Sequence, residues 1–431
     1  MAAVVGAQEA LPFGGCPRRP NFDGSARRPW EAALTYSSDV LILGGGLTGI
    51  FAGLRLARAG VRAILVDNPL PSGARKVGGF AGFSGAKFSL PPAGLGLVPV
   101  AGGIDNFNSA LTAVLSMLGL GKSDGPLPEE APSLQNGPDR LLRKYHSFVL
   151  TPVEIDELLQ RLSSELNQGV QVIQAKVFGI SPSNGGWRVK VAYPNMTNAM
   201  EIEAGTVFYA GGRLAEDLLV SAGATPTDGK GLDIGVRLEF LDRECLRELR
   251  NHGPDAKILS GQCRTFCLNV PGKIFRYPFG EISIPGGVVA ESTETSANVG
   301  ILLRVHDKAQ RLREILSKTR GLHAEILCQS NLTRRGPIEL PALMSRAFTE
   351  ESSRLIENFC SELSEMGLVD FRKDYRIHLP LLDWHWHTFA LPNSHRTTLP
   401  NVFALGDSAG HARGLLQAAL SGWLAAEEYI S

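Results

Sequence analysis

The sequence predicts an α/β fold: a parallel sheet that continues into a three-stranded antiparallel β-meander, with an α+β domain inserted into the chain. Three observations predict it. An apolar strand, a glycine-rich turn, an amphipathic helix and a second strand follow one another over residues 39–67. Three strand-like runs separated by turns lie between residues 170 and 210, and a short strand followed by a helix returns at 401–431. Alternating strands and helices favour a parallel sheet, whereas successive strands joined by tight turns favour an antiparallel one.

The first turn carries three glycines, Gly44, Gly46 and Gly49, at G-x-G-x-x-G spacing after the apolar strand. In this pattern the first glycine makes the tight turn, the second lets the backbone approach a pyrophosphate, and the third lets the helix pack closely on the strand. Leu47 and Thr48 lie at the start of that helix, where free N–H groups and the positive dipole end attract an anion.

The second strand, 61–66, ends in an acid, Asp67, which Asn68 follows. Asp67 lies 18 residues after Gly49, close to the separation of about 20 at which an acid takes the ribose hydroxyls of a dinucleotide. Because strand, helix, second strand and acid are all in register, we interpret the segment as a dinucleotide site, not as a bare glycine-rich turn.

The middle of the predicted first domain holds a helix and the three meander strands. A capping box with proline at the first helical position, T-P-V-E at 151–154, predicts a helix that ends at Gly169. The strand-like runs that follow are 170–180, 187–193 and 200–210. The last of them is apolar and ends in Ala210, followed by Gly211 and Gly212, which again predict close backbone approach.

The pattern is less regular after residue 236. We expect strands at 287–290 and 298–305 and helices at 308–318 and 350–368. The predicted organisation is a flexible tail over 1–38, a nucleotide-binding domain over 39–236 and 380–431, and an inserted substrate domain over 237–379. The tail is rich in Ala, Gly, Pro and Arg and has no apolar core segment, so we do not interpret it as a signal peptide.

Composition excludes several classes of partner. The 43 basic and 43 acidic side chains cancel, which argues against a nucleic-acid partner. No apolar run reaches the 18 or so residues of a membrane span. The six cysteines are scattered without a secretory leader, so we expect a reducing, cytoplasmic compartment.

The last segment has the same pattern as the first, an apolar strand followed by a glycine-containing turn and a helix. The apolar strand at 401–405 ends in Gly406 and Asp407, and Gly414 opens a helix with Leu415 and Leu416. This helix is so rich in Ala, Leu and Gly that it must be buried on most sides. A buried helix N-terminus needs acceptors for its free N–H groups, which the edge of an anionic or electron-rich cofactor would supply.

Together, the front motif with its acid, the strand ending in Ala-Gly-Gly and the late N-V-F-A-L-G-D resemble the fingerprint of the two-dinucleotide-binding-domain FAD flavoproteins, which have a Rossmann-like FAD-binding domain. More narrowly, four blocks are similar to a family of bacterial FAD-dependent dehydrogenases of largely unassigned substrate. These blocks are VGGFAGFSGAK at 77–87, DIGVRLE at 233–239, CRTFC at 263–267 and GDSAGHARGLLQAALSG at 406–422.

The resemblance implies FAD as the cofactor and a role for each motif. The three glycines would hold its pyrophosphate, Asp67 the adenosine ribose, and the backbone of Val177 the adenine. Asp407 would hold the ribitol or the pyrophosphate, and the N–H groups at 414–416 would face flavin N1 and the C2 carbonyl, where a helix dipole stabilises negative charge. Further cofactor contacts are expected at Leu47, Thr48, Asn68, Ala210, Gly211 and Gly406.

Few residues are candidates for proton transfer. The run DWHWHTF at 383–389 alternates as a strand does, which would place Asp383, His385 and His387 on one face. We take His387 as the candidate general base, with packed or surface histidines as the alternative. A metal held by these three side chains is a further alternative that a flavin makes unnecessary, so no metal is predicted.

Two of the cations inside the blocks that carry the resemblance are candidates for the site. Lys87 in the glycine-rich block and Arg264 within CRTFC would bind an acidic substrate or stabilise reduced flavin, unless they form ordinary ion pairs. Cys263 and Cys267 are separated by three residues, unlike the Cys-x-x-Cys of a redox dithiol, and are interpreted as small buried residues. Arg413, like His411, is a further candidate contact at the start of the last helix.

The resemblance therefore implies an FAD-dependent dehydrogenase or oxidase that moves a hydride from a small organic substrate to flavin N5 and passes the electrons to oxygen or an external acceptor. No second G-x-G-x-x-G follows residue 100, which argues against a built-in nicotinamide domain. The alternatives are the reverse reaction, reduction of a C=C or C=N bond, and a flavoprotein that passes electrons to a protein partner.

Overall fold

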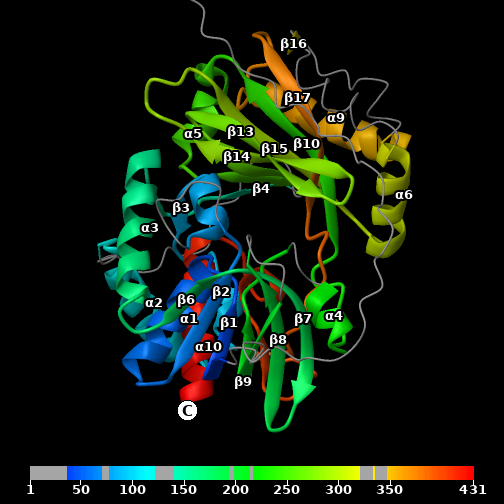
Figure 1. The fold of residues 1–431 in the computed structure, drawn as a ribbon. Coiled ribbons are helices and arrows are strands. Elements are labelled where there is room, and N and C mark those ends of the chain that lie inside the picture. Colours follow the sequence, from blue (N-terminus) through cyan, green and yellow to red (C-terminus); the bar gives the residue numbers. More distant parts are fainter. Residues whose placement is uncertain are drawn as a thin grey trace, which may run out of the picture. The chain divides into compact units, whose positions relative to one another are not determined.

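The structure, a computed structural model, describes residues 36–69, 77–121, 140–193, 199–213, 217–320, 333–334 and 347–431. All described elements belong to one compact unit, Thr35–Ser431. They form two seven-stranded sheets and two short two-stranded sheets (Figure 1). The fold is α/β, as predicted.

The first sheet joins a parallel part to an antiparallel meander. Its strand order is β6-β2-β1-β9-β8-β7, and β18 also pairs with β9. The strands are β1 (Tyr36–Leu43), β2 (Ala63–Asp67), β6 (Gln171–Gln174), β7 (Lys176–Ser183), β8 (Gly186–Ala192), β9 (Met200–Tyr209) and β18 (Val402–Ala404). Strands β6, β2, β1, β9 and β18 run parallel, whereas β7, β8 and β9 run antiparallel. This confirms the predicted parallel sheet with its three-stranded meander.

The parallel strands are apolar throughout because both of their faces are covered. In β1, Val40 and Ile42 pack into the core on the helical face, whereas Leu41 and Leu43 pack into the core on the meander face. The helices on the first of these faces are α1 (Leu47–Arg58), α2 (Ile104–Leu118), α3 (Pro152–Leu166) and α10 (Leu415–Ile430). The short helix α4 (Asp217–Ser221) packs on the meander face.

Helices α1 and α10 are in direct backbone contact, although they are far apart in the sequence (Figure 1). A Cβ atom added at Gly422 of α10 would lie 2.0 Å from the carbonyl oxygen of Thr48 in α1. Only glycine at this position lets the two helices approach so closely.

The capping box predicted at the start of α3 is present in the structure. Thr151 and Glu154 form the capping box of α3, with the Glu154 N–H donating to Thr151 Oγ1 at 3.2 Å and the Thr151 N–H donating to Glu154 Oε2 at 2.7 Å. Gly60 follows α1 with a φ of +73°, which suits a residue just past a helix end. One difference concerns the run 170–180, which divides at Ala175 into β6 and β7.

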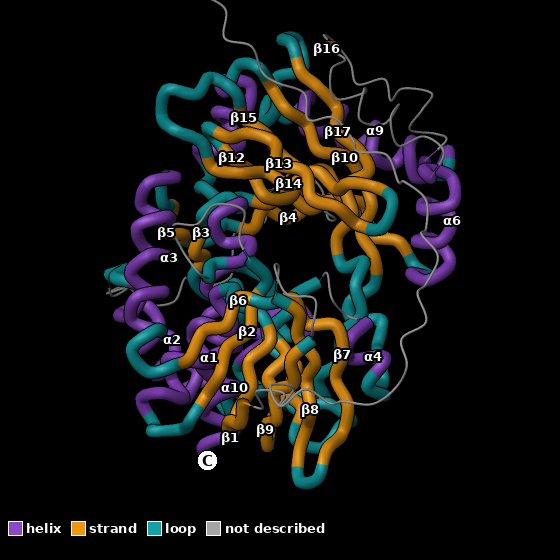
Figure 2. Tube along the Cα trace, in the orientation of Figure 1, coloured by secondary structure: helices purple, strands orange, loops and turns teal. Residues whose placement is uncertain are grey.

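The second sheet is antiparallel throughout, in the order β16-β17-β10-β15-β12-β11-β4 (Figure 2). Its strands are β4 (Arg140–Arg143), β10 (Leu232–Phe240), β11 (Lys257–Ser260), β12 (Cys263–Asn269), β15 (Ala297–Val305), β16 (Thr333–Arg334) and β17 (Tyr375–Asp383). Helices α5 (Arg247–Asn251), α6 (Lys308–Arg320) and α9 (Glu350–Glu365) and the hairpin of β13 (Gly272–Phe279) and β14 (Ile282–Val289) contribute to its core. The β13–β14 hairpin is one of the two-stranded sheets. The other pairs β3 (Lys87–Ser89) with β5 (Ser147–Val149).

The second sheet bears on the predicted domain boundaries and on one predicted strand. Strands β10 and β17 run across the predicted boundaries at 236/237 and 379/380, and β4 comes from the preceding segment. The boundaries themselves stay a prediction. The strand expected over 383–389 ends at Asp383, because Trp384 adopts a left-handed conformation with a φ of +58°. Among the described residues, no helix combines the length and apolar composition that a membrane crossing requires.

Candidate functional site

The three glycines of the first turn occupy three different environments. Gly44 has a φ of +112°, and a Cβ there would lie 2.4 Å from the carbonyl oxygen of Ala210. A Cβ at Gly49 would lie 1.9 Å from the Gly44 carbonyl oxygen, whereas one at Gly46 would meet nothing within 4 Å. The turn therefore has a tight corner, a close packing contact and, between them, one open backbone position.

Helix α1 begins at this open position. Gly46 is its N-cap and Leu47 its first residue, and no side chain caps its N–H groups. Uncapped N–H groups beside an open glycine form an anion site of the kind that binds phosphate.

The acid at the end of β2 lies against the same turn. The carboxylate of Asp67 accepts hydrogen bonds from the backbone N–H groups of Gly45 and Asn68, but burial is the larger effect and raises its pKa to about 6. The Ala175 N–H donates to the Asp67 carbonyl at 2.9 Å. This contact brings the start of β7, where Val177 lies beside a β-bulge, close to the acid.

The glycine-rich block after β2 packs on the turn. The Gly78 N–H donates to the carbonyl of Gly45 at 2.7 Å, and a Cβ at Gly79 would lie 3.0 Å from Gly46 Cα. The block continues as a short 3₁₀ helix, η1 (Gly79–Phe83). Gly78 and Gly79 thus serve a backbone-to-backbone contact with the turn.

The Gly406-Asp407 turn lies against the start of α1. A Cβ at Gly406 would lie 2.6 Å from Thr48 Oγ1, so the turn after β18 touches the first turn of α1. Gly414, with a φ of +126°, is the N-cap of α10, and no side-chain hydrogen bond caps it. Leu415 and the buried Leu416 begin that helix, so the predicted glycine positions of both motifs lie at helix starts.

Asp407 lies close to two arginines. Its carboxylate lies 3.4 Å from Arg213 Nε and 3.8 Å from Arg413 Nε. Burial raises the pKa of Asp407, although Arg213 opposes this. The indole N–H of Trp386 donates to the Asp407 carbonyl at 2.9 Å.

Both arginines also lie on aromatic rings. The guanidinium groups of Arg213 and Arg413 are 4.9 and 5.0 Å from the centre of the Trp386 ring. Arg213 donates to the Tyr277 hydroxyl at 3.2 Å and lies 5.7 Å from the Phe80 ring. These separations suit cation–π attraction, which strengthens where water is excluded.

Strands of the second sheet supply further charges. Arg264 Nη2 lies 2.6 Å from Asp233 and 3.1 Å from Asp383, both almost fully buried. Arg413 also pairs with Asp383, and Arg304 with Asp233.

We call this group the arginine–aspartate cluster: Arg213, Arg264, Arg304, Arg413, Asp233, Asp383 and Asp407. It holds four guanidinium groups and three carboxylates, so one positive charge within it has no matching carboxylate. Burial lowers the pKa of Arg413 well below its usual value, and the neighbouring Arg213 adds to this.

Of the three predicted catalytic residues, only Arg264 belongs to the cluster. The Lys87 ammonium is buried between the Leu268 carbonyl and the Asp255 carboxylate, 3.8 Å away. His387 is 40% exposed at its side chain and lies 4.0 Å from Asp228. The structure therefore does not gather the predicted three into one site.

The environment of His385 differs from the strand face shared with Asp383 and His387 that the alternating sequence predicted. Its side chain is buried, 4.1 Å from the Phe279 ring, and neither ring nitrogen has a hydrogen-bond partner. Burial lowers its pKa well below the usual value, and Arg213 and Lys308 contribute in the same direction. Burial and these two cations thus all disfavour the charged form of His385. The described residues contain no group of three or more His, Cys, Asp or Glu placed to hold a metal ion.

Sequence reasoning missed Arg213 and Tyr277. A signal for Arg213 was present, because it follows the Gly-Gly at the carboxyl end of β9, the edge of a parallel sheet where ligands bind. Tyr277 gave no such signal, since it lies within β13 of the irregular segment.

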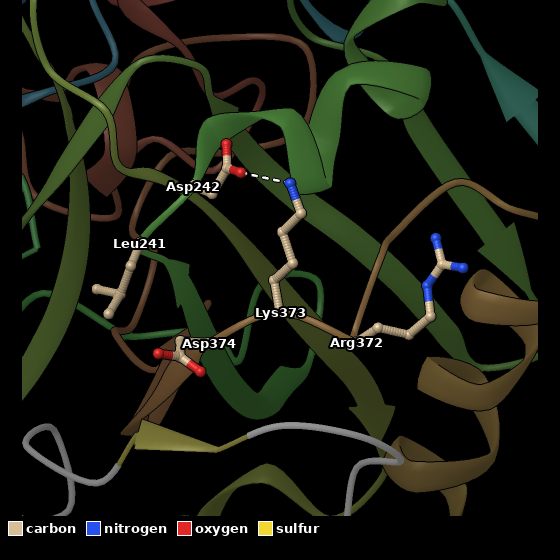
Figure 3. Close-up of a pocket in the computed structure, with 5 residues that line it drawn as sticks. All are labelled: Leu241, Asp242, Arg372, Lys373 and Asp374. Carbon is tan, nitrogen blue, oxygen red and sulfur yellow. Dashed lines mark hydrogen bonds and ion pairs between the residues drawn. The ribbon is translucent and has the colours of Figure 1, made fainter.

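Two hollows lie outside this cluster. An open depression of about 420 Å³ lies between the end of β10 and the start of β17, lined by Leu241, Asp242, Arg372, Lys373 and Asp374 (Figure 3). Lys373 and Asp242 pair across it. A much smaller cavity of about 20 Å³ lies beside Lys87 and Asn269.

Neither a protein-family profile nor a curated protein sequence matches the chain. Solved structures with a similar fold include the FrdA chain of quinol fumarate reductase from E. coli, at 15% identity and a TM-score of 0.45, covering 92% of this chain and 70% of that one. A geranylgeranyl bacteriochlorophyll reductase-like protein from Thermoplasma acidophilum has 16% identity and a TM-score of 0.41, with 91% and 78% covered. A flavoprotein/dehydrogenase from Cytophaga hutchinsonii has 12% identity and a TM-score of 0.41, with 91% and 78% covered. Likenesses this distant assign no activity, which has to come from the residues of the site.

Proposed function

We propose that this chain is an FAD-dependent oxidoreductase that moves a hydride from a small organic substrate to flavin N5. The observation that carries the proposal is the open backbone position at Gly46, where α1 begins without a cap. An acid from β2 and the late glycine of the G-D motif, Gly406, lie against the same turn and helix start.

The residues of the turn fit the diphosphate and ribose of the cofactor. A phosphate at Gly46 would accept hydrogen bonds from the N–H groups of α1. Asp67 lies at the end of the neighbouring strand, where its carboxylate would accept from ribose hydroxyls. When bound, FAD supplies the redox chemistry, and the protein supplies binding, orientation and electrostatics.

The arginine–aspartate cluster would bind the substrate. Arg213 and Arg413 lie against the Trp386 ring, which is itself only 1% exposed, and the cluster carries one more positive than negative charge. Guanidinium groups bind carboxylates in a bidentate manner, and desolvation strengthens the pair. These features support an anionic substrate.

We assign proton transfer to the two histidines of segment 383–389. His385 favours the neutral form and has two unpartnered ring nitrogens, so it can accept a hydrogen bond from a substrate O–H or N–H group. His387, beside Asp228, is the candidate base that the sequence suggested. Electrons would leave to oxygen or to an external acceptor.

A side chain placed on the open glycine tests the proposal. A Cβ at Gly46 would meet no atom of the described residues within 4 Å. Gly46→Val should therefore obstruct the phosphate approach while the protein still folds, and the variant should lose the absorbance at roughly 450 nm that bound oxidised flavin gives. Gly121→Val, at another glycine whose Cβ would meet no described atom within 4 Å, is the matched control and should keep it. A yellow Gly46→Val protein, or a wild-type protein that stays colourless with added FAD, would overturn the assignment.

The reverse reaction is the second candidate, because an anion site near a redox cofactor would also hold an unsaturated acid. Anaerobic mixing separates the two directions. A substrate that bleaches the oxidised protein supports hydride removal, whereas one that restores the colour of the reduced protein supports reduction. Reduction by a partner protein alone would instead support electron transfer between proteins.

A further inference from the structure

Strand β12 carries a bulge at Cys267. Phe266 pairs with Gly300 and Asn269 with Asn298, so two residues of β12, Cys267 and Leu268, face a single residue of β15. Cys267 has a φ of +46°, a conformation that residues other than glycine rarely adopt. Bulges turn a side chain away from the regular direction of a strand and are common beside functional sites.

Two buried cations lie next to this bulge. Arg237 is 1% exposed and donates to the Cys267 carbonyl at 3.1 Å and to Asn298 Oδ1 at 2.8 Å. Among the described residues no carboxylate pairs with Arg237. On the other side, the Lys87 ammonium donates to the carbonyl of Leu268. Lys87 also lies 3.8 Å from the Asp255 carboxylate, so of the two cations only Arg237 has no opposite charge among the described residues. A buried charge without an opposite charge is costly, so an anion at this position would stabilise Arg237.

The Asn269 side chain contacts the thiol and also lines the small cavity, whereas Cys267 itself is not among the lining residues. Asn269 Nδ2 lies 3.6 Å from Cys267 Sγ, and Asn269 Oδ1 has no hydrogen-bond partner although the residue is only 3% exposed. A Cβ at Gly85 would lie 2.4 Å from that Oδ1, and both residues line the cavity of about 20 Å³. An unpartnered acceptor at a cavity of this size suits a very small ligand that donates a hydrogen bond.

The same groups set the charge of the thiol. Burial and the Asp255 carboxylate both act to raise the pKa of Cys267, but Lys87, Arg237 and the Asn269 amide outweigh them and hold the pKa below the usual value. The three other cysteines of the described residues differ. Burial raises the pKa of Cys245 to about 11 and that of Cys263 to about 12, and it raises the pKa of Cys360 as well.

We propose that Cys267 is a nucleophilic thiol that reacts with hydrogen peroxide. The ligand would donate one O–H to Asn269 Oδ1 while the thiolate sulfur attacks one of its oxygens. The S–O bond forms, the O–O bond breaks and hydroxide leaves next to Lys87. The cysteine is thereby oxidised by two electrons to sulfenic acid, and the peroxide is reduced to hydroxide, which solvent protonates to water.

The experiment uses the full chain, with and without added FAD, so that its result does not depend on the proposed function. The protein is treated with hydrogen peroxide, sulfenic acid is trapped with dimedone, and each cysteine peptide is quantified by mass spectrometry. Label should appear at Cys267 and not at Cys245, Cys263 or Cys360. Cys267→Ser should abolish that label, and Cys263→Ser should leave it unchanged.

A pH profile tests the charge of the thiol. Alkylation of Cys267 by iodoacetamide should stay fast below pH 8, where an ordinary thiol of pKa about 8.5 is mostly protonated. Lys87→Met removes one cation and keeps the apolar stem, so it should slow both reactions at pH 7 on the order of tenfold. Equal labelling of all the cysteines, or an unreactive Cys267 in protein with an unchanged circular dichroism spectrum, would overturn the proposal.

Discussion

At the scale of single residues, burial controls the charges around the candidate site. It raises the pKa values of Asp67 and Asp407 and lowers those of Arg413 and His385. In each case the charged form is disfavoured because the side chain has lost water. A ligand that hydrogen-bonds the charged form would reverse the shift, so ligand binding and protonation should be coupled.

Asp67 gives the clearest case of this coupling. Its pKa is raised to about 6, so the carboxyl group is protonated below that pH and ionised above it. Ribose hydroxyls bind the ionised form more strongly, by about 1.5–3 kcal/mol for a hydrogen bond to a charged group. FAD affinity should therefore rise about tenfold between pH 5 and pH 7, measured by fluorescence titration. In Asp67→Asn the affinity should be weak at both values; an unchanged pH dependence in that variant would contradict the assignment.

The glycine positions could be predicted residue by residue because their spacing encodes a local geometry. Gly44, Gly46 and Gly49 need only the strand and helix on either side of them. The partners of Arg213 and Arg413 could not be predicted from the sequence. The positions of these partners depend on the strand register of two sheets and on segments far apart in the sequence. Lys87 was a reasonable candidate by motif, yet Asp255 and the Leu268 carbonyl hold it inside the protein.

At the scale of elements, the regular helices, the parallel strands and β15 of the second sheet were predictable, and the other strands of the second sheet were not. The capping box fixed the start of α3, and both faces of β1 are apolar. Strand β10 was missed because Asp233 and Arg237 lie at buried positions where the strand pattern calls for apolar residues. Asp233 pairs with Arg264 and Arg304, and Arg237 donates hydrogen bonds to the Cys267 carbonyl and Asn298 Oδ1. These partners lie on other strands, so no local pattern contains them.

The crossing of α1 and α10 links packing to cofactor binding. A methyl group at Gly422 would overlap the Thr48 carbonyl, so Gly422→Ala should separate the helices and destabilise the protein by about 1–3 kcal/mol. Because Thr48 lies at the start of α1, FAD affinity should fall as well. Thermal unfolding and FAD titration measure the two effects.

Gly121→Ala, which adds a methyl group in open space, is the control for this crossing. It should change neither the melting temperature nor the affinity. A Gly422→Ala protein with wild-type affinity would show that the crossing does not position the cofactor site.

At the scale of the whole compact unit, the arginine–aspartate cluster joins the two large sheets. Arg213 follows β9 of the first sheet, whereas Arg264 and Arg304 lie on β12 and β15 of the second. Arg413 precedes the helix that packs on α1. The excess of one guanidinium group over the carboxylates is thus placed by the fold as a whole, from residues of both large sheets, and under the proposed function it should select the charge of the ligand.

Ligands matched in shape and different in charge test this selection. Benzoate and benzamide are alike in size and shape, but only benzoate carries a negative charge that can pair with Arg213 and Arg413. Benzoate should perturb the visible spectrum of the FAD-loaded protein at concentrations about tenfold lower or more, since a hydrogen bond to a charged group contributes about 1.5–3 kcal/mol. Arg213→Gln should remove this preference, while Arg372→Gln, at the depression in Figure 3, should retain it. Equal binding of benzoate and benzamide by the wild type would mean that the aspartates already neutralise the cluster.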